Sequence, residues 1–578
     1  MAADNLLQEF PPVSTQSWEE VIRKDLKGAD YSRKLIWKTE EGLAVKPYYR
    51  AEDIAGLEHQ DTAPGEFPYM RSARLTGDWR IREEIDAADP ERARQTACGA
   101  IAAGAEEISF SDVAIKDASD LRTLLANLQE TPVHFAKADE SLIRLLIERQ
   151  DSSQTSTGWN PLMNLDFAAE VIASAPSTLE PFTIHGEEFE ESGATVIEEI
   201  GFTLAAAVDF LAEMQFRKVE IERAAASIAF SFAIGSNYFF QIAKLRAFRI
   251  LWARAVESFG GGRTSAKAKI HARTSRWNKT IYDPHVNILR GTTEAMSAVF
   301  GSADSITVAP FDECYKIPDE ASLRLARNTQ ILLKQEALLS QVADPGAGSY
   351  YLEVVTDFIA REGWRTMQAI EASGGYRRAL QDGRIAQALD KSLATREDAV
   401  ASRRRIFVGT NQYPSLSEEA LDRIDFSRMN YSKRGAQVYE ELRLRTERHA
   451  AKTGTCPRVL LAEIGDSEMR SARSSFAADF FGSAGFDIVM QLFFSTDEIA
   501  VCEAELIVLC SSDAEYLALA AGLTRKLKSL GRETPVLIAG YPESAEQLLA
   551  AGVADSIHIR SNPIKVLLKW QQQLGIKG

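Results

Sequence analysis

Short apolar runs alternate with helical patterns along most of the chain. Between residues 78 and 400 we predict eight strands: WRIREEI from Trp79, EEISF from Glu106, VHFA from Val133, PLMNLDF from Pro161, PFTIH from Pro181, ASIAFSF from Ala226, AKIHART from Ala268 and SITVAPF from Ser305. The segments between these runs carry apolar residues at helical spacing. Eight repeats of strand and helix are typical of a (β/α)8 barrel, the TIM barrel, which we predict here.

A second and more apolar alternation follows a break rich in Thr, Gly and Pro near residue 455. Its predicted strands are VLLAEIG, FDIVMQL, ELIVLCSS, PVLIAGY and SIHIR, and amphipathic helical patterns separate them. Strands this apolar are buried on both faces, as in a parallel sheet covered by helices. The pattern therefore predicts a flavodoxin-like, doubly wound domain.

These patterns divide the chain into four parts. We predict an N-terminal arm over residues 1–60, the barrel over 61–400, a charged helical linker over 401–455 and the flavodoxin-like domain over 456–578. In the arm, the segment SWEEVIRKDLKG predicts a helix whose apolar face consists of Trp18, Val21, Ile22 and Leu26.

One predicted barrel helix, over residues 237–259, carries a row of basic residues. They are Lys244, Arg246, Arg249 and Arg254. Such a row could bind an anionic ligand, but it is more often a solvated helix face, so we predict exposed side chains.

Composition narrows the class of protein. The chain has 578 residues, too many for one hydrophobic core. Its formal charge, 66 − 82 = −16, argues against a nucleic-acid partner. Five dispersed cysteines without a CxxC pair predict neither a metal site nor a disulfide framework. The longest apolar stretch, near residues 224–234, is too short to span a bilayer, so we expect a cytoplasmic protein without membrane contact.

Five stretches resemble the methylmalonyl-CoA mutase family. They are GATVIEEIGFTLA from Gly193, AIGSNYFFQIAKLRAFRILWA from Ala233, RTSRWNKTIYDPHVN from Arg273, RGTTEAMSA from Arg290 and ARNTQILLKQEALLSQVADPGAGSYYLE from Ala326. With the arm and the C-terminal pattern, the resemblance covers nearly the whole chain. It implies a radical interconversion of methylmalonyl-CoA and succinyl-CoA that depends on adenosylcobalamin.

The resemblance also shows where this chain departs from the family's cobalamin loop. The family places Asp-x-His-x-x-Gly after the first strand of the C-terminal sheet, and that His ligates cobalt. Here the loop reads IGDSEMRSARSS, and Asp466 matches the family's Asp. Glu468 stands where the His should fall, or Arg470 does if the loop is aligned without a gap. Ser471 replaces the Gly. A strand-to-helix turn capped by Asp466 explains the loop without a ligand.

Two further positions of the implied cobalamin pocket are also changed. The family has Ser-x-Leu after the third strand and Gly-Gly after the fourth, which leave room for the cofactor's nucleotide tail. This chain has Cys510 and Ser512 at the first place and Ala539 and Gly540 at the second. We expect no cobalamin on this chain and an inert, buried Cys510.

The implied substrate positions of the barrel are changed as well. Glu187 and Glu188 replace a Tyr-His pair after the fifth strand, and an ionised carboxylate cannot donate a hydrogen bond to a thioester carbonyl. Two consecutive acids more often lie in a solvated loop than form an acid/base pair. Ala97 replaces a helix tyrosine, and Ser227 and Ala229 replace an Arg-x-Ser pair.

These departures are similar to those of small subunits from heterodimeric members of the family. The resemblance then implies a non-catalytic chain that stabilises a homologous large subunit. Only that large subunit would carry adenosylcobalamin, and acyl-CoA binding by this chain is doubtful. The arm would belong to the subunit contact. Two alternatives remain open: an active mutase for another acyl-CoA with contacts rewired at Glu187 and Glu188, and a stand-alone binding or chaperone-like protein.

Overall fold

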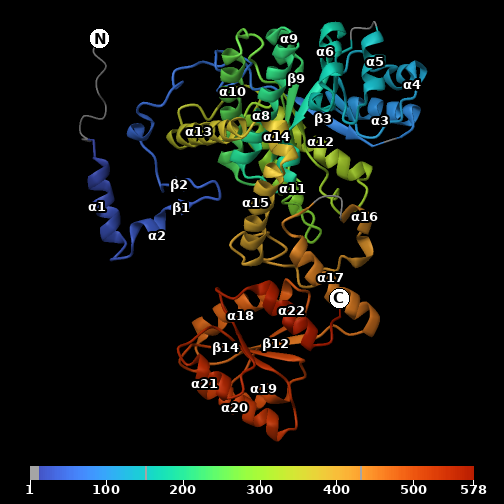
Figure 1. Cartoon of the computed structure of the whole chain (residues 1–578). Coiled ribbons are helices and arrows are strands. Elements are labelled where there is room, and N and C mark those ends of the chain that lie inside the picture. Colours follow the sequence, from blue (N-terminus) through green and yellow to red (C-terminus); the bar gives the residue numbers. More distant parts are fainter. Residues whose placement is uncertain (1–11, 87, 150–152, 430–432, 578) are drawn as a thin grey trace.

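The computed structural model describes residues 12–86, 88–149, 153–429 and 433–577. The chain forms, in order, an extended arm, a barrel, a helical connection and a second α/β domain (Figure 1). No helix within these ranges is long and apolar enough to cross a membrane.

The barrel is a ring of parallel strands in which β11 pairs with β3. Its strands are β3 (Arg80–Ile85), β4 (Glu107–Phe110), β5 (Val133–Phe135), β6 (Thr155–Thr157), β7 (Leu179–Glu180), β8 (Phe182–His185), β9 (Ile228–Ile234), β10 (Ile270–Thr274) and β11 (Ser305–Thr307). Pro181, which cannot donate a ladder hydrogen bond, separates β7 from β8. The nine segments are therefore eight barrel strands, and the predicted barrel is confirmed.

The prediction of the fourth strand was wrong. PLMNLDF forms the 3₁₀ turn η2 (Pro161–Met163) and the start of α6 (Leu165–Ser174), while the strand lies earlier, at Thr155–Thr157. The Asn164 side chain accepts a hydrogen bond from the Phe167 amide and so caps α6. The true strand, Thr-Ser-Thr, contains no apolar residue, so the hydrophobic pattern gave no indication of it.

Helices surround the barrel and continue beyond its last strand. They are α3 (Pro90–Ala102), α4 (Ala118–Leu125), α5 (Glu140–Glu148), α6, α7 (Glu187–Glu191), α8 (Val196–Phe216), α9 (Ile221–Ala226), α10 (Tyr238–Ser258), α11 (Val286–Phe300), α12 (Glu320–Gln335), α13 (Tyr350–Ala372), α14 (Tyr376–Gln381) and α15 (Arg384–Ala401). Helix α13 packs across α8 and α10, which places both of these helices inside the core.

That burial overturns the prediction of a solvated basic face on α10. The side chains of Lys244, Arg246 and Arg249 are almost completely buried, and only Arg254 is exposed. Lys244 pairs with Glu199 of α8 at 2.7 Å. A buried cation needs such partners: Glu353 of α13 supplies that of Arg246, and the Gly301 and Ser302 carbonyls at the end of α11 supply those of Arg249.

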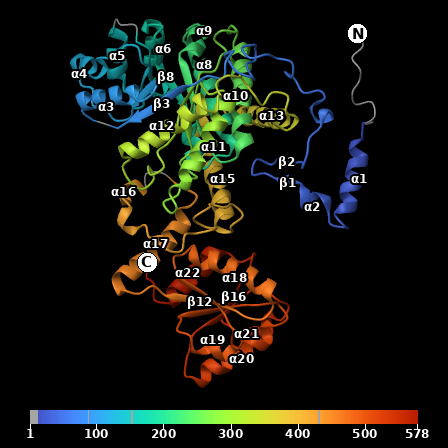
Figure 2. The same ribbon diagram turned by 180° about the vertical axis from the view of Figure 1, so that it is seen from behind.

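The first part of the arm, residues 12–35, lies apart from the barrel in both views (Figures 1 and 2), whereas Val45 belongs to the barrel's hydrophobic core and Tyr49 packs against it. The arm consists of α1 (Thr15–Asp25), α2 (Tyr31–Leu35), β1 (Trp37–Lys38), β2 (Ala44–Val45) and the 3₁₀ turn η1 (Ala51–Ile54). The side chain of Ser14 caps the predicted helix, and Trp18 stacks on Tyr48 with 4.9 Å between ring centroids. No residue of α1 is buried. The first eleven residues of the predicted arm lie outside the described ranges.

The C-terminal domain contains a five-stranded parallel sheet in the order β13-β12-β14-β15-β16, which is the flavodoxin-like order. The strands are β12 (Arg458–Glu463), β13 (Asp487–Leu492), β14 (Leu506–Cys510), β15 (Val536–Ala539) and β16 (Asp555–Ile557). Helices α18 (Ser467–Gly482) and α22 (Pro563–Gln573) cover one face. Helices α19 (Thr496–Val501), α20 (Tyr516–Ser529) and α21 (Ala545–Ala550) cover the other.

The connection contributes to the core of the C-terminal domain. It contains η3 (Leu421–Arg423), α16 (Phe426–Met429) and α17 (Gln437–Thr453). Tyr439 and Leu442 of α17 share a hydrophobic cluster with the sheet and α22. The Gln571 amide donates to the Leu442 carbonyl at 2.7 Å. These contacts fix α17 against the sheet.

Candidate functional site

The barrel lumen is lined by polar side chains. Most (β/α)8 barrels fill this space with branched apolar residues. Here strand alternation turns polar and small residues inward around a cavity of about 110 Å³, among them Arg82, Glu84, Ser109, His134, Ser156, Thr183, His185, Ser231, His271, Arg273 and Ser305. We take this polar lumen as the candidate site.

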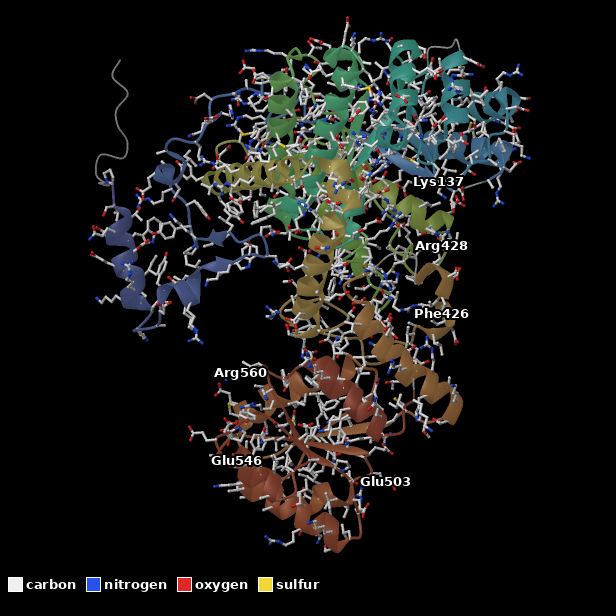
Figure 3. All side chains as sticks on the ribbon, viewed as in Figure 1. Lys137, Phe426, Arg428, Glu503, Glu546 and Arg560 are labelled. Atoms are coloured by element: carbon white, nitrogen blue, oxygen red, sulfur yellow. The ribbon has the colours of Figure 1, made fainter. Side chains whose placement is uncertain are left out.

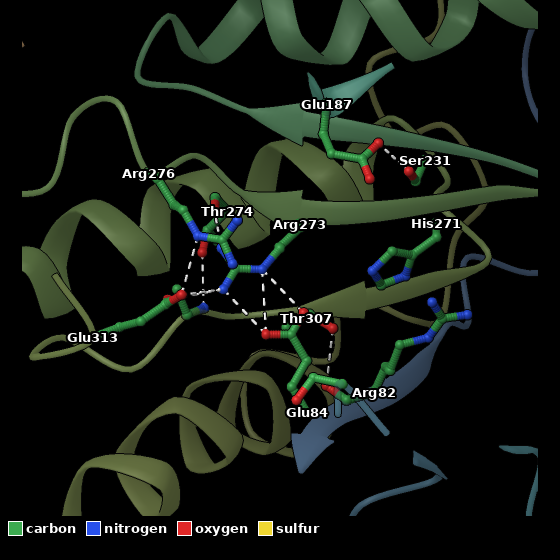
Figure 4. Close-up of polar contacts among 12 residues, drawn as sticks. Arg82, Glu84, Glu187, Ser231, His271, Arg273, Thr274, Arg276, Thr307 and Glu313 are labelled. Atoms are coloured by element: carbon green, nitrogen blue, oxygen red, sulfur yellow. Dashed lines mark hydrogen bonds and ion pairs between the residues drawn. The ribbon is translucent and has the colours of Figure 1, made fainter. Parts of the chain in front are cut away.

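Ion pairs between arginines and glutamates close the carboxyl end of the lumen (Figure 4). Arg273 of β10 contacts Glu84 of β3 at 3.0 Å and Glu313 at 2.7 Å. Arg276 contacts Glu313 at 3.1 Å and Glu191 of α7 at 2.8 Å. Burial favours the neutral form of Glu313, but the two guanidinium groups outweigh it and lower its pKa to about 2. Each charged group of this network is therefore paired with a group of opposite charge.

A second pair lies on the opposite wall of the lumen. His185 Nδ1 is 2.8 Å from Glu187 Oε1, and His185 Nε2 is 2.7 Å from the Gly158 carbonyl. Burial would lower the pKa of His185, but Glu187 and the carbonyl raise it to about 9. The Ser231 hydroxyl donates to Glu187. Both acids lie in helix α7, so the prediction of a solvated loop is wrong, although Glu188 is exposed.

Two further histidines of the lumen are neutral. His134 Nδ1 lies 2.9 Å from Ser156 Oγ, and His271 Nδ1 lies 2.9 Å from Ser305 Oγ. Burial, and then the nearby Arg82 guanidinium, lower the pKa of both rings well below the usual value. Both rings therefore resist protonation in the folded chain.

These shifts predict that acid destabilises the barrel. As pH falls through 6.5, the unfolded chain protonates His134 and His271 while the folded chain does not, so the free energy of unfolding falls. His185 acts oppositely, because its stabilising contribution is complete below pH 6.5 and is lost as pH rises through about 9. Urea unfolding between pH 5 and pH 7 measures the acid effect. The double variant His134→Gln/His271→Gln should flatten the curve, and an unchanged slope would contradict this account.

The structure does not bring all predicted barrel positions together. Ala97 is a buried residue of α3 and belongs to the cluster on the outer side of β3 and β4. Ser227 ends α9, and its hydroxyl donates to the Ala224 carbonyl at 2.7 Å. Only Ala229 lines the lumen together with Glu187.

Hydrogen bonds close the carboxyl edge of the C-terminal sheet. The Glu515 carboxylate accepts from the Ser511 hydroxyl at 2.7 Å, from the Ser512 hydroxyl at 2.6 Å and from the Asp466 amide at 3.1 Å. The bonds to Ser512 and Ser511 lower the pKa of Glu515 to about 2. A Cβ atom at Gly465 would lie 2.5 Å from this carboxylate. Glu515 therefore fills the space above the loop that follows β12.

The other predicted C-terminal positions are accounted for by local structure. Asp466 caps α18 by accepting from the Met469 amide, and Glu468 and Ser471 are exposed on that helix. Cys510 is buried, which raises the pKa of its thiol. The Ala539 carbonyl accepts from the Tyr516 hydroxyl at 2.7 Å, and Gly540 lies against Arg473.

Sequence reasoning missed Glu515 and the charged lining of the lumen. The spacing Ser512-x-x-Glu515 is that of a capping box and could have identified the first. Charged residues at alternate positions of WRIREEI and AKIHART could have identified the second, because they occupy one face of a strand. No group of three or more His, Cys, Asp or Glu side chains in the described ranges is arranged to hold a metal ion.

The chain thus belongs to the class of proteins that combine a (β/α)8 barrel with a flavodoxin-like domain, and the lumen of its barrel is polar. The family model of methylmalonyl-CoA mutase matches residues 38–124 and 161–468. The chain is 35% identical to the methylmalonyl-CoA mutase small subunit of Porphyromonas gingivalis over 99% of both chains. It is 30% identical to the small subunit of Streptomyces virginiae over 94% of both. The large subunit of that organism is 28% identical over 78% of this chain and 69% of its own length. The chain belongs to the methylmalonyl-CoA mutase family.

Proposed function

We propose that this chain is the non-catalytic small subunit of an adenosylcobalamin-dependent methylmalonyl-CoA mutase. The observation that carries the proposal is the ion-pair network of Arg273, Glu84 and Glu313 at the carboxyl end of the barrel. Barrel enzymes place their reacting groups at this end. Here its charges are already paired with one another, so no unpaired cation of the network is left for an anionic substrate.

The residues of the C-terminal domain do not fit a cobalamin. The family's cobalt ligand is an imidazole, whereas this loop offers Asp466 as a helix cap and exposed Glu468. Glu515 fills the space beside Gly465. We therefore assign the cofactor to the homologous large subunit and derive no chemical step through it on this chain.

The role left to the chain is assembly. A large and pseudo-symmetric interface with a homologue would stabilise the folded large subunit, because a partner that binds only the native state shifts the folding equilibrium. The first helix of the arm fits this role, since α1 lies apart from the barrel with Trp18 and Val21 exposed.

We expect the purified chain to leave the visible spectrum of hydroxocobalamin unchanged in a titration. The variant Glu468→His should also leave it unchanged, because Glu515 still fills the space above the loop and the Tyr516 hydroxyl still bonds the Ala539 carbonyl. Gel filtration with bound cofactor as readout provides an independent measurement. A stoichiometric micromolar complex with either protein would contradict the assignment of the cofactor to the partner.

An active mutase for a different acyl-CoA is the second candidate. It is favoured by the protonated His185 beside Glu187 in the lumen, a cationic side chain three residues before the position of the family's histidine. Turnover of reconstituted complexes separates the two candidates. For a non-catalytic barrel, Glu188→Gln should leave turnover per assembled complex nearly unchanged, since exposed polar substitutions usually have effects within about 0.5 kcal/mol. Loss of turnover with assembly intact would favour the second candidate.

A further inference from the structure

A cleft of about 490 Å³ lies between the connection and the C-terminal domain and shares no residue with the barrel lumen. Three segments form its walls: the residues that follow α15, one side of α18, and the loop from β16 into α22. Exposed Arg560 belongs to this loop and lies on the side of the domain nearest the rest of the chain (Figure 3). The volume is within the range of small-molecule sites.

Arg403 places a positive charge in the cleft. It follows Ser402, the C-cap of α15, and has a φ of 57°, a left-handed conformation that helices usually give to glycine at this position. Its Nη2 atom is 3.3 Å from Gln412 Oε1 and 3.8 Å from Asp479 Oδ2. Its Nη1 atom is buried and has no hydrogen-bond partner among the described residues. An unpaired buried donor is costly, so an acceptor that reaches this atom would stabilise the arginine.

Two further donors line the cleft. His558 Nδ1 accepts from the Arg560 amide at 3.1 Å, so the proton of the neutral ring is on Nε2. Burial and the Arg560 charge lower the pKa of His558, which keeps the ring neutral at pH 7. The Ser561 hydroxyl accepts from the His558 amide at 3.0 Å and retains its own proton for donation.

The acceptors and the other charges of the cleft are already engaged. Asp479 accepts from the Tyr413 amide at 3.2 Å and lies beside Arg403. Arg404 donates to the Ser402 hydroxyl and pairs with Asp398. Free donors therefore outnumber free acceptors, and the cleft suits an anion.

Part of the remaining wall is apolar. The Phe476 ring lies 5.8 Å from the Arg403 guanidinium carbon, and Ile559 is 86% exposed beside His558. An apolar surface next to unpaired donors favours a ligand that combines an anionic group with a hydrophobic body. Inorganic phosphate would use only the donors.

We propose that this cleft binds a small organic phosphate, with the phosphate on Arg403, His558 and Ser561 and the organic part against Phe476 and Ile559. Arginine suits the phosphate because its planar guanidinium donates two parallel hydrogen bonds. This site goes beyond the proposed subunit role and does not depend on it.

Isothermal titration of the full chain with phenyl phosphate tests the site. We expect saturable binding with one site per chain, and weaker binding of inorganic phosphate, which lacks the apolar body. Arg403→Gln should weaken phenyl phosphate binding by about tenfold or more, because it removes a charge-assisted hydrogen bond. Arg525→Gln is the matched control, since Arg525 is exposed on α20, across the sheet. No binding by the unmodified chain, or equal loss in both variants, would overturn the proposal.

A second pair of variants protects the test against misfolding of Arg403→Gln. Ser475 is exposed on α18 and lines the cleft. Ser475→Glu brings a negative charge to the cleft without disturbing buried groups, and it should weaken binding severalfold. Ser475→Gln has a similar shape without the charge and should bind like the unmodified chain. Equal affinities for these two variants would count against an anion site in the cleft.

Discussion

Replacing Lys244 by Met should lower the free energy of unfolding by about 3–5 kcal/mol, since the substitution leaves a buried carboxylate without its cation. Lys244 and Glu199 are 0% and 1% exposed, and their charged atoms are 2.7 Å apart. Burial raises the pKa of Glu199 to about 7 even with Lys244 in place. Without Lys244 the carboxyl will protonate more readily, so the loss should be smaller at pH 5 than at pH 8. Urea unfolding at both values measures it.

Two controls separate the unpaired charge from lost packing. The double variant Lys244→Met/Glu199→Leu should recover much of the stability, because well-packed apolar residues often replace a buried ion pair at little cost. Arg254→Met on the same helix should change stability by no more than about 0.5 kcal/mol, since Arg254 is exposed. A double variant as unstable as Lys244→Met would show that the pair itself is not responsible.

The sequence could predict the strands of the fold but not the burial of the cations on α10. Apolar runs identified seven of eight barrel strands and all five strands of the C-terminal sheet. This was possible because a buried parallel strand is recognised by the apolar residues that it contains itself. Burial of the α10 cations depends on partners that lie far away in sequence. Glu199 is 45 residues from Lys244, and Glu353 is 107 residues from Arg246. Residue spacing within one helix carries no information about such partners.

The positions of the candidate site could be predicted from sequence, but their partners could not. Sequence placed Glu187 after the fifth strand and Asp466 at a helix start, since both positions follow from local patterns. It did not pair Arg273 with Glu84, 189 residues away, or Asp466 with Glu515, 49 residues away. In both cases the partner lies far away in sequence, and only the fold brings it into contact.

Replacing Val21 by Glu should weaken association with the large subunit by about 10- to 100-fold while leaving the isolated chain folded. Val21 is 58% exposed and Trp18 is 47% exposed, so the arm's apolar face has little to contact within its own chain. Burying an apolar side chain of this size in a partner contributes roughly 1.5–3 kcal/mol, and a carboxylate there would also be desolvated. Co-purification and total turnover should fall together, while turnover of each assembled complex should remain normal.

The arm helix provides its own matched control. Gln16 lies on the polar side of α1, close to the amino end of the helix, and its amide donates to Glu20 at 3.3 Å. Gln16→Glu adds the same charge to the same helix at a position that is not part of the apolar face. It should leave association close to normal, because negative charge near a helix N-terminus is favourable. If both variants weaken association equally, general charge repulsion would explain the result. If neither does, the arm is not part of the subunit contact, and the exposed apolar face of α1 needs another partner.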